Sequence, residues 1–310
     1  MQSEIRKDYV QEKYVIIAPH RKARPHAIAR QAVRSQEKTF CYFCPEALHG
    51  VKKLARRGSG TAWQVVSIAN IFPAVSQNNP KAYGCQEVVV ETPDHTKELD
   101  DLSVTHISRI FEVYAERTRS ISRDKKIEYI LIFKNNGGRA GASLQHAHSQ
   151  IFATEFLPPH LKDKSQKVQE YKLTTGGCIY CDVIAKEQLG PRLVWEDKHV
   201  IAFTPYASMH NYEIWIMPKR HLDNITVLTS GEKRSMARTL KYVLRRITDL
   251  NLPYNFYFHQ VINDEDQHLY MKVTPRGSVW AGVEIGSGLI INPITPEDAA
   301  KFYRKGNLLK

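Results

Sequence analysis

Two stretches of the chain decide the fold, because they are two versions of one pattern: Glu87-Val-Val-Val-Glu-Thr-Pro-Asp-His95 and Glu213-Ile-Trp-Ile-Met-Pro-Lys-Arg-His221. Each begins with glutamate, continues through β-branched and other apolar residues, and reaches a histidine eight positions later. Such runs favour a β-strand, and the proline in each marks the point where strand pairing must end. The pattern indicates that the chain contains an internal duplication.

The segments that follow these stretches also match each other. Apolar residues at helical spacing predict a helix over residues 102–120 in the first copy and over 230–248 in the second. Ser103 and Ser230 are the expected N-caps, because a serine hydroxyl can accept a hydrogen bond from an amide of the first helical turn. Both copies therefore have a strand followed by a helix of similar length.

A further strand is predicted after each helix, over residues 129–133 and 254–258. The order and spacing of the elements predict an α+β protein built from two related units, each an antiparallel sheet with a helix packed on one face. We expect one domain over residues 1–160 and the other over 161–310. The segment 156–177, which has two prolines and then many charged residues, is expected to join them.

The cysteines supply a metal-binding hypothesis. Cys85 stands alone and is expected to be a buried thiol, whereas the other four form two Cys-x-x-Cys pairs, one near the start of each copy. In a reducing compartment such pairs are metal sites or redox dithiols more often than disulfides. Each copy also offers two histidines, which completes a tetrahedral set for a structural zinc ion. The two predicted sets are Cys41, Cys44, His95 and His146, and Cys178, Cys181, His221 and His268. The alternatives are free thiols or a second set that has lost its metal.

The two copies differ at their ends, and this difference locates the chemistry. His148 in the first copy has Tyr270 as its counterpart, and Gln150 has Lys272. His146 and His148 are two positions apart, so on a strand they would point to the same face. One can then hold a metal ion while the other reaches a substrate. We therefore expect the first copy to be catalytic and the second to be a scaffold with a binding role.

The residue types around His148 suit transfer of a phosphorus group. A neutral imidazole is a good nucleophile toward phosphorus, and the bond that it forms is labile. The loop 135–143 is rich in glycine, alanine and serine, so its backbone amides can approach phosphate oxygens. Ser143 and Gln150 can donate hydrogen bonds as charge develops, and Arg21 and Arg24 add cations for a diphosphate. The alternatives are that both histidines bind metal or one is a surface residue, that the loop is an ordinary turn, and that the arginines are merely solvated.

Composition excludes few classes of protein. The net charge of +12 could indicate nucleic-acid binding, but the basic residues are spread along the chain and no recognised nucleic-acid-binding module is visible. The hydrophobic fraction of 42% is ordinary for a globular protein, and no apolar run is long enough to cross a bilayer. The first residues lack the apolar run of a secretion signal. We expect a cytoplasmic protein that binds neither nucleic acid nor membrane.

Several motifs together carry a family resemblance. They include Arg6-Lys-Asp-Tyr9, the arginine-rich segment 18–25, Cys41-Tyr-Phe-Cys44, Asn70-Ile-Phe72 and Glu91-Thr-Pro-Asp-His95, followed by Asn135 and the His-x-His-x-Gln run. In this order they resemble the galactose-1-phosphate uridylyltransferase family, a branch of the histidine-triad superfamily. The similarity extends over nearly the whole chain, and it implies that the two copies are histidine-triad-like units of which the second is degenerate.

The resemblance implies a ping-pong reaction and a role for each matching residue. His148 would attack the α-phosphorus of a nucleotide sugar and release a sugar 1-phosphate, and Gln150 would stabilise the nucleotidylated intermediate. The nucleotidyl group would then pass from His148 to a second sugar 1-phosphate. Family members are usually homodimers whose sites are completed across the interface. The matching binding positions are Asn70 and Phe72 for base and ribose, Asn135, Gly141 and Ser143 for phosphates, and Glu284 for the hexose.

The chain departs from the family pattern in ways that leave the substrate open. It has His-Ala-His-Ser-Gln where the family usually has His-Pro-His-Gly-Gln, and Ile71 replaces an acidic residue beside Asn70. Ser278 and Val283 stand near Glu284 where lysine and tyrosine are expected. These features also resemble ADP-glucose phosphorylases, which discharge an adenylylated histidine to inorganic phosphate. The leading prediction is a UDP-glucose:galactose-1-phosphate uridylyltransferase, with ADP-glucose phosphorylase as the alternative. A nucleotide hydrolase would have a third histidine in place of Gln150, and a zinc-stabilised nucleic-acid-binding protein is the remaining hypothesis.

Overall fold

The structure is a computed structural model, and it describes residues 2–23, 40–59, 62–262 and 264–305. Its main feature is a sheet of ten strands in which every neighbouring pair is antiparallel. In spatial order the strands are β3 (Ala55–Ser59), β4 (Ala62–Ala69), β5 (Gly84–Val90), β7 (His148–Thr154), β6 (Tyr129–Asn136), β11 (Tyr254–His259), β12 (Tyr270–Pro275), β10 (Ile214–Pro218), β9 (Val200–Phe203) and β8 (Leu193–Glu196). The predicted α+β class is confirmed.

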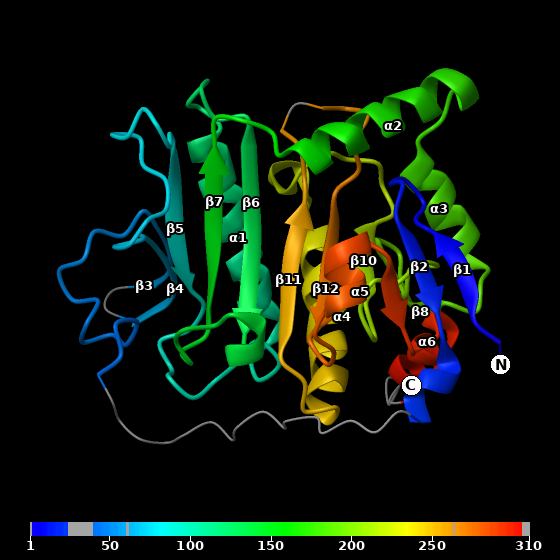
Figure 1. Ribbon diagram of the computed structural model, residues 1–310. Helices are drawn as coiled ribbons and strands as arrows, with labels where there is room; N and C mark the ends of the chain where they lie inside the picture. Colours follow the sequence, from blue (N-terminus) through cyan, green and yellow to red (C-terminus); the bar gives the residue numbers. More distant parts are fainter. Residues whose placement is uncertain (1, 24–39, 60–61, 263, 306–310) are drawn as a thin grey trace.

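The two predicted units meet at the centre of this sheet. β6 of the first copy pairs with β11 of the second, with Asn135 opposite Asn255 and Phe133 opposite Tyr257. On either side of this seam the strands follow in mirrored order, so the copies are related by a pseudo-twofold axis (Figure 1). The two expected sheets are therefore continuous, and backbone hydrogen bonds across the seam tie the copies into one body.

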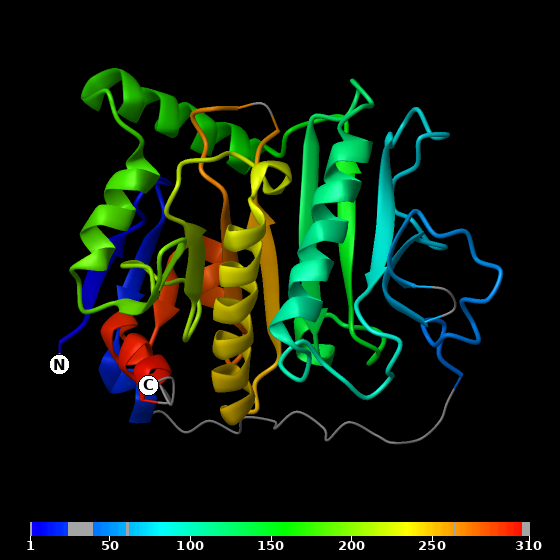
Figure 2. The same ribbon diagram turned by 180° about the vertical axis from the view of Figure 1, so that it is seen from behind.

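One long helix from each copy covers the same face of the sheet. The helices are α1 (Val104–Ile121) and α4 (Ser230–Asp249), and they lie side by side in front of the strands in the view of Figure 2. Apolar side chains of both helices form the main core with the strands beneath them. Burial of each large apolar side chain contributes roughly 1.5–3 kcal/mol relative to its exposure. This packing makes one face of the sheet a core and leaves the other face available for a site.

The helices extend to within two residues of the predicted bounds, and their N-caps show one difference from prediction. Ser103 is the N-cap of α1, as expected, and its side chain accepts a hydrogen bond from the amide of His106. In α4 the N-cap is Thr229 and not Ser230. Thr229 and Glu232 form a capping box in which each side chain accepts a hydrogen bond from the other residue's amide. This reciprocal pair satisfies two amides, which Ser230 could not do because it lies only two residues before Glu232.

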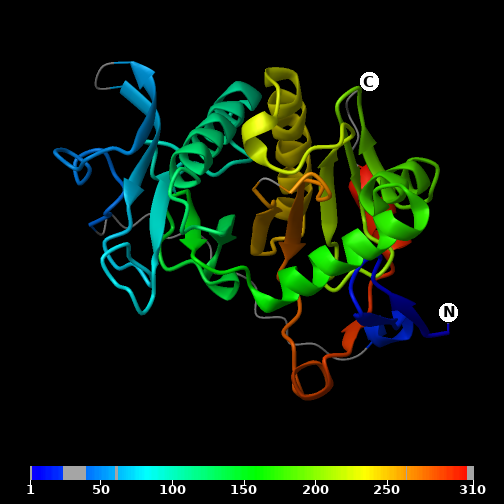
Figure 3. The ribbon, with the colours of Figure 1, turned by 90° about the horizontal axis from the view of Figure 1, so that it is seen from above.

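Smaller elements cover the opposite face of the sheet, mainly over the second copy (Figure 3). The segment 156–177, predicted to be a joining segment, contains a helix of its own, because Pro159 starts it and Leu161, Lys164 and Val168 are buried at helical spacing. The elements on this side are β1 (Glu4–Lys7), β2 (Tyr14–Ile17), α2 (Pro159–Thr175), α3 (Ile179–Gln188), α5 (Gly282–Ser287) and β13 (Ile290–Asn292), whereas α6 (Pro296–Arg304) packs against α4 at the same end of the molecule. β13 pairs in parallel with β2, and β2 pairs antiparallel with β1, in a separate three-stranded sheet.

The duplicated strands match with a one-residue offset from the sequence alignment. Glu87 accepts hydrogen bonds of 2.8 and 2.7 Å from Arg117 of α1, so its side chain lies on the helix-covered face. Glu213 pairs with Lys272 at 2.7 Å on the opposite face. The residue that occupies the place of Glu213 in the first copy is therefore Gln86, one position earlier than the aligned Glu87. Side chains alternate along a strand, so a slip of one residue exchanges the two faces.

Among the described residues, no helix combines the length and the hydrophobicity that crossing a membrane would require.

Candidate active site and metal centres

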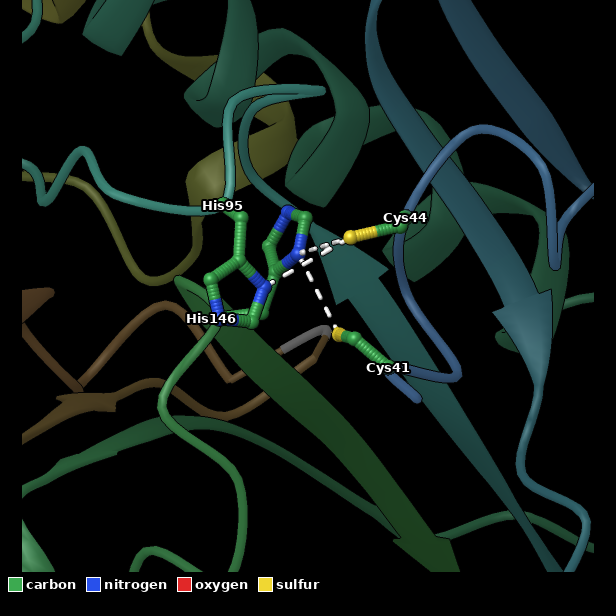
Figure 4. Close-up of side chains that lie close together, drawn as sticks. All are labelled: Cys41, Cys44, His95 and His146. Carbon is green, nitrogen blue, oxygen red and sulfur yellow. Dashed lines mark hydrogen bonds between the residues drawn. The ribbon is translucent and has the colours of Figure 1, made fainter. Parts of the chain in front are cut away.

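The first predicted metal set comes together in space. Cys41 and Cys44 lie in the turn before β3, His95 follows β5, and His146 precedes β7. Their four side chains turn toward one another (Figure 4), and the four candidate ligand atoms all lie within 4.8 Å of one another. The predicted strand position of His146 is wrong by two residues, because β7 begins at His148.

The distances in this cluster fit a tetrahedral ion. The Nδ1 atom of His146 is 3.5 Å from the sulfur of Cys41, and the Nδ1 atom of His95 is 3.5 Å from the sulfur of Cys44. Bonds of about 2.3 Å to sulfur and about 2.0 Å to nitrogen give tetrahedral edges of roughly 3.5 Å. The Nε2–H group of His146 donates to the backbone oxygen of Thr92 at 2.7 Å, which leaves Nδ1 unprotonated and directed at the cysteines. The donor set therefore fits zinc.

The second set forms an equivalent cluster, again with its four ligand atoms within 4.8 Å. The sulfur of Cys181 is 3.4 Å from Nδ1 of His221 and 3.7 Å from Nδ1 of His268. His268 donates through Nε2 to the backbone oxygen of Pro218 at 2.9 Å. Pro218 stands three residues before His221, as Thr92 stands three residues before His95. Both clusters thus orient the corresponding histidine by the same backbone contact.

His148 lies beside the first cluster on the face of the sheet opposite α1. Its side chain is 7% exposed, and its ring lies 4.9 Å from the ring of Phe43. The Nδ1–H group donates to the backbone oxygen of His146 at 2.8 Å, so Nε2 is the nitrogen that carries the lone pair. Burial, and then the charge of Lys134, lower the pKa of His148 to about 4. The ring is therefore neutral at physiological pH and can act as a nucleophile.

Gln150 lies two residues further along β7, on the same face as His148. Its Oε1 atom accepts a 2.7 Å hydrogen bond from Nε2 of Gln86 on β5. This contact fixes the orientation of the Gln150 amide and leaves its NH₂ group as the donor. Gln86 was not singled out in the sequence, because only the register of β5 against β7 places it beside Gln150.

A buried ion cluster lies beneath the start of β7, on the helix-covered face. Lys134 is 1% exposed and contacts the carboxylates of Glu91 at 2.6 Å and Glu98 at 3.3 Å. Its ammonium group also donates to the backbone oxygen of His148 at 3.1 Å. The hydroxyl groups of Tyr114 and Ser149 meet at 2.6 Å next to Glu91. Sequence reasoning missed this cluster, although a lysine at an inward position of an apolar strand was a signal that could have found it.

The loop before β7 lies where β6 meets β11. Asn255 donates through Nδ2 to Oδ1 of Asn135 at 2.7 Å and to the backbone oxygen of Ala140 at 2.7 Å. Gly141 has a φ of +88°, which is accessible to glycine at low cost. Ser143 is exposed. Because Asn255 comes from the second copy, the position of the loop depends on both copies.

The remaining predicted binding residues lie on several different elements, and not all of them are close to His148. Asn70 follows β4, and its Oδ1 atom accepts a hydrogen bond from the amide of Phe72, whose side chain is 84% exposed. Burial opposes the charge of Glu284, but backbone hydrogen bonds and the charge of Arg21 outweigh burial and lower the pKa of Glu284. Arg21 and Glu284 therefore lie near each other. Both belong to the elements in front of the second copy, apart from β7 (Figure 1). Arg24 lies outside the described residues.

The duplicated fold, the two Cys₂His₂ clusters and the buried histidine define a duplicated α+β protein with two candidate metal centres and a candidate nucleophile. The sequence model described as "Galactose-1-phosphate uridyl transferase, N-terminal domain" matches residues 1–158. The chain belongs to the galactose-1-phosphate uridylyltransferase family.

Full-length relatives agree with this assignment. The chain is 31% identical to the ADP-glucose phosphorylase of Arabidopsis thaliana, with 98% of this chain and 93% of that protein covered. It is 29% identical to the galactose-1-phosphate uridylyltransferase of Thermotoga maritima, with 97% and 98% covered. Among solved structures, the Arabidopsis ADP-glucose phosphorylase with bound ADP-glucose superimposes with a TM-score of 0.88 at 31% identity over 99% of this chain and all of that one. A uridylyltransferase structure gives a TM-score of 0.78 at 30% identity, with 97% of each chain covered.

Proposed function

We propose that this protein is a nucleotidyltransferase that works by a ping-pong reaction through a nucleotidylated His148. One observation carries the proposal: the hydrogen bond from Nδ1 of His148 to the backbone oxygen of His146 leaves Nε2 as a neutral, buried nucleophile. In the first step Nε2 attacks the α-phosphorus of a nucleotide sugar, an N–P bond forms, and the P–O bond to the departing sugar 1-phosphate breaks. In the second step an oxygen of the acceptor phosphate attacks the same phosphorus and the N–P bond breaks.

Gln150 has the role of a donor to the phosphorus-bound oxygens. Gln86 already donates to its carbonyl oxygen, so the NH₂ group is the part of the amide that serves as donor. A preorganised donor of this kind stabilises the charge that develops in the transition state, and the loss of one typically lowers the rate by about 10²–10³. Asn135, Gly141 and Ser143 would contact the phosphates, and the Asn70–Phe72 segment would contact the base and ribose.

The leading substrates are UDP-glucose and galactose 1-phosphate, as for the uridylyltransferases among the relatives. The second candidate is an ADP-glucose phosphorylase that transfers an adenylyl group to inorganic phosphate. This alternative is favoured by the overall shape, because the TM-score is 0.88 to the ADP-glucose phosphorylase and 0.78 to the uridylyltransferase. Both candidates use the same histidine chemistry, and they differ in the base and in the acceptor.

We infer that the enzyme acts as a homodimer in which the partner completes the site. Arg21, Arg24 and Glu284 would then serve the site of the partner subunit. The segment around α5 supports this arrangement, because it projects from the rest of the molecule (Figure 3) and exposes apolar side chains. Val279 is 70% exposed and Ile285 is 76% exposed. Exposed apolar side chains grouped in this way are typical of an interface.

The two metal sets are proposed to bind structural Zn²⁺, one in each unit of the chain. A catalytic first unit, residues 1–160, and a degenerate second unit, residues 161–310, would each have its own metal. When bound, the metal would supply cross-links between the Cys-x-x-Cys turn and two histidines, and it would hold His146 and therefore the peptide that orients His148. We expect the enzyme to work in the cytoplasm on small phosphorylated substrates.

An exchange experiment tests the function and identifies the base. The protein is incubated with labelled glucose 1-phosphate and either UDP-glucose or ADP-glucose, without any other acceptor. A ping-pong enzyme moves the label into the nucleotide sugar that it accepts, and His148→Ala abolishes the exchange. The transferase proposal is wrong if neither nucleotide sugar acquires label with the metal-loaded wild-type protein.

A further inference from the structure

A ligand-sized cavity lies in the second copy, on the same face of the ten-stranded sheet as His148. Its volume is about 420 Å³. Side chains of β11 and β12 form its floor, α2 forms one wall, and the N-terminal segment that includes Asp8 and Lys13 forms another. A cavity of a few hundred cubic ångströms, mostly apolar with a few polar groups, is typical of a small-molecule site.

The position of this cavity follows from the duplication. Tyr270 and Lys272 line it, and they are the counterparts of His148 and Gln150. In the first copy Gln86 donates to Gln150 at 2.7 Å, whereas in the second copy Glu213 pairs with Lys272 at the same distance. The cavity therefore occupies the place in the second copy that the candidate active site occupies in the first.

Lys164 of α2 is the most informative group in the cavity wall. The residue is 6% exposed, and its ammonium group donates to the hydroxyl of Tyr270 and lies 4.7 Å from the centre of that ring. Within the described part of the chain no carboxylate forms an ion pair with Lys164. An ammonium group has three donors, and a buried cation without an anion is costly. Burial lowers the pKa of Lys164 to about 7, and an anion in the cavity would keep it protonated.

The other charged groups around the cavity leave an excess of positive charge. Lys272 is balanced by Glu213, and the Asp8 carboxylate accepts hydrogen bonds from the amides of Val10 and Gln11 at 3.0 and 2.9 Å. Lys13 and His160 are exposed at the rim. Lys13 and Lys164 together outnumber Asp8, so the polar part of the cavity suits an anion.

Most of the remaining lining residues are aromatic or apolar, with Gln11 and His259 as the polar exceptions. Tyr129, Leu131 and Phe152 approach from the first copy, and Trp215 and Tyr257 from the second. Trp215 and Tyr270 are stacked on each other, with 4.5 Å between ring centres, so this pair gives the cavity a well-packed aromatic wall. A ligand that fills this space needs a flat apolar part as well as an anionic group.

We propose that this cavity is a second binding site for a nucleoside monophosphate, separate from the site at His148. The phosphate would lie against Lys164 with Lys13 at the entrance, and the base against the aromatic wall. Tyr270 stands where the nucleophile would be, so this site binds without transferring the nucleotide. The proposal does not depend on the reaction at His148.

Equilibrium dialysis with labelled AMP and labelled UMP tests the proposal on wild-type and variant proteins. Lys164→Met removes the charge and keeps the length of the side chain, and Lys13→Glu reverses the charge at the rim, where little can disturb folding. Loss of one charged hydrogen bond corresponds to a loss of affinity of about tenfold or more at the affected site. Lys162→Met, on the exposed side of α2, is the matched control.

The proposal predicts that at least one of the two nucleotides has a site that weakens about tenfold or more in both Lys164→Met and Lys13→Glu and is unchanged in Lys162→Met. Nucleotidylation of His148 is expected to persist in Lys13→Glu. Binding isotherms for both nucleotides that are the same in wild type and Lys13→Glu would contradict the proposal. Competition by inorganic phosphate alone as strong as by the nucleotide would reduce the site to a simple anion site and would contradict the nucleotide assignment.

Discussion

Lys134 donates a 3.1 Å hydrogen bond to the backbone oxygen of His148. The same ammonium group contacts Glu91 and Glu98, so a buried cation with two carboxylates supports the first residue of β7. In the second copy, the positions that correspond to Lys134 and Ser149 are occupied by the apolar residues Phe258 and Met271, which lie in the main core. Among the described residues, the ion cluster therefore belongs only to the copy that has the candidate nucleophile, and we interpret it as a group that positions His148.

Replacement of Lys134 by methionine is expected to destabilise the protein strongly. It leaves Glu91 and Glu98 buried without a counter-charge, and breaking one side of a buried ion pair costs about 3–5 kcal/mol. Denaturant titration measures the loss. The double variant Lys134→Met/Glu91→Gln should recover part of it, whereas Lys7→Met, in an exposed ion pair with Glu12, should scarcely change stability. A single variant as stable as wild type would exclude the supporting role.

Metal content is expected to follow the two clusters independently. Wild type should contain two zinc ions per chain, one for each group of four ligands, and Cys41→Ser and Cys178→Ser should each lose one. Removal of metal by a chelator should lower the thermal unfolding midpoint, because binding at such sites is coupled to folding. Elemental analysis and thermal melts measure both effects, with Cys85→Ser as the control that keeps both metals. Full thermal stability after complete metal removal would contradict a structural role for the two metal ions.

The acidity of Glu232 gives a prediction for the pH dependence of stability. Burial opposes its charge, but hydrogen bonds from Arg220 and Thr229 outweigh that effect and lower its pKa from 4.5 to about 2. A carboxylate with a lowered pKa in the folded state contributes stability that is present above about pH 4.5 and is lost as the pH falls toward 2. Glu232→Gln keeps an oxygen that can accept from the Thr229 amide but loses the charge that pairs with Arg220, so it should reduce stability by about 1 kcal/mol at pH 7. The difference from wild type should shrink in denaturant titrations below pH 4.5. A constant difference from pH 7 to pH 3 would contradict this cause.

Gln86 is expected to affect the reaction through Gln150. Gln150→Glu keeps the hydrogen bond from Gln86 but removes both amide donors, so the rate of nucleotidylation should fall by about 10²–10³. Gln86→Met leaves the donors in place but frees the amide to rotate, so a smaller fall of about tenfold is expected. Single-turnover kinetics with each variant measures the effect, with the exposed Gln166→Met as the control. Equal rates in Gln86→Met and wild type would exclude the orienting role.

Much of the fold was predictable because two copies of one sequence pattern support the same assignment of elements. The matching runs Glu87–His95 and Glu213–His221 and the two Cys-x-x-Cys pairs were sufficient to predict the α+β class and both clusters of metal ligands. The union of the copies into one sheet was not predictable, since pairing of β6 with β11 depends on strand edges that have no local signature. The helix α2 was also missed, because prolines and charges suggested a linker although Leu161, Lys164 and Val168 are spaced as one helical face.

The site was predictable where a residue stands out against its counterpart. His148 was found because the second copy has Tyr270 at that position. Gln86 was not found, because the sequence alignment of the two copies matched Glu87 with Glu213. In the structure the residue that corresponds to Glu213 is Gln86, one position earlier on β5. A one-residue slip exchanges the faces of a strand, so alignment alone could not tell which side chain faces Gln150.

In the proposed reaction, His148 carries the nucleotide. The adduct is tested most directly by the intact mass of the protein after incubation with UDP-glucose or ADP-glucose, followed by peptide mapping under conditions that preserve the N–P bond. We expect a mass gain equal to one UMP or one AMP on the peptide that contains His148, with no gain in His148→Ala. An adduct on another residue, or no adduct with either nucleotide sugar, would contradict it.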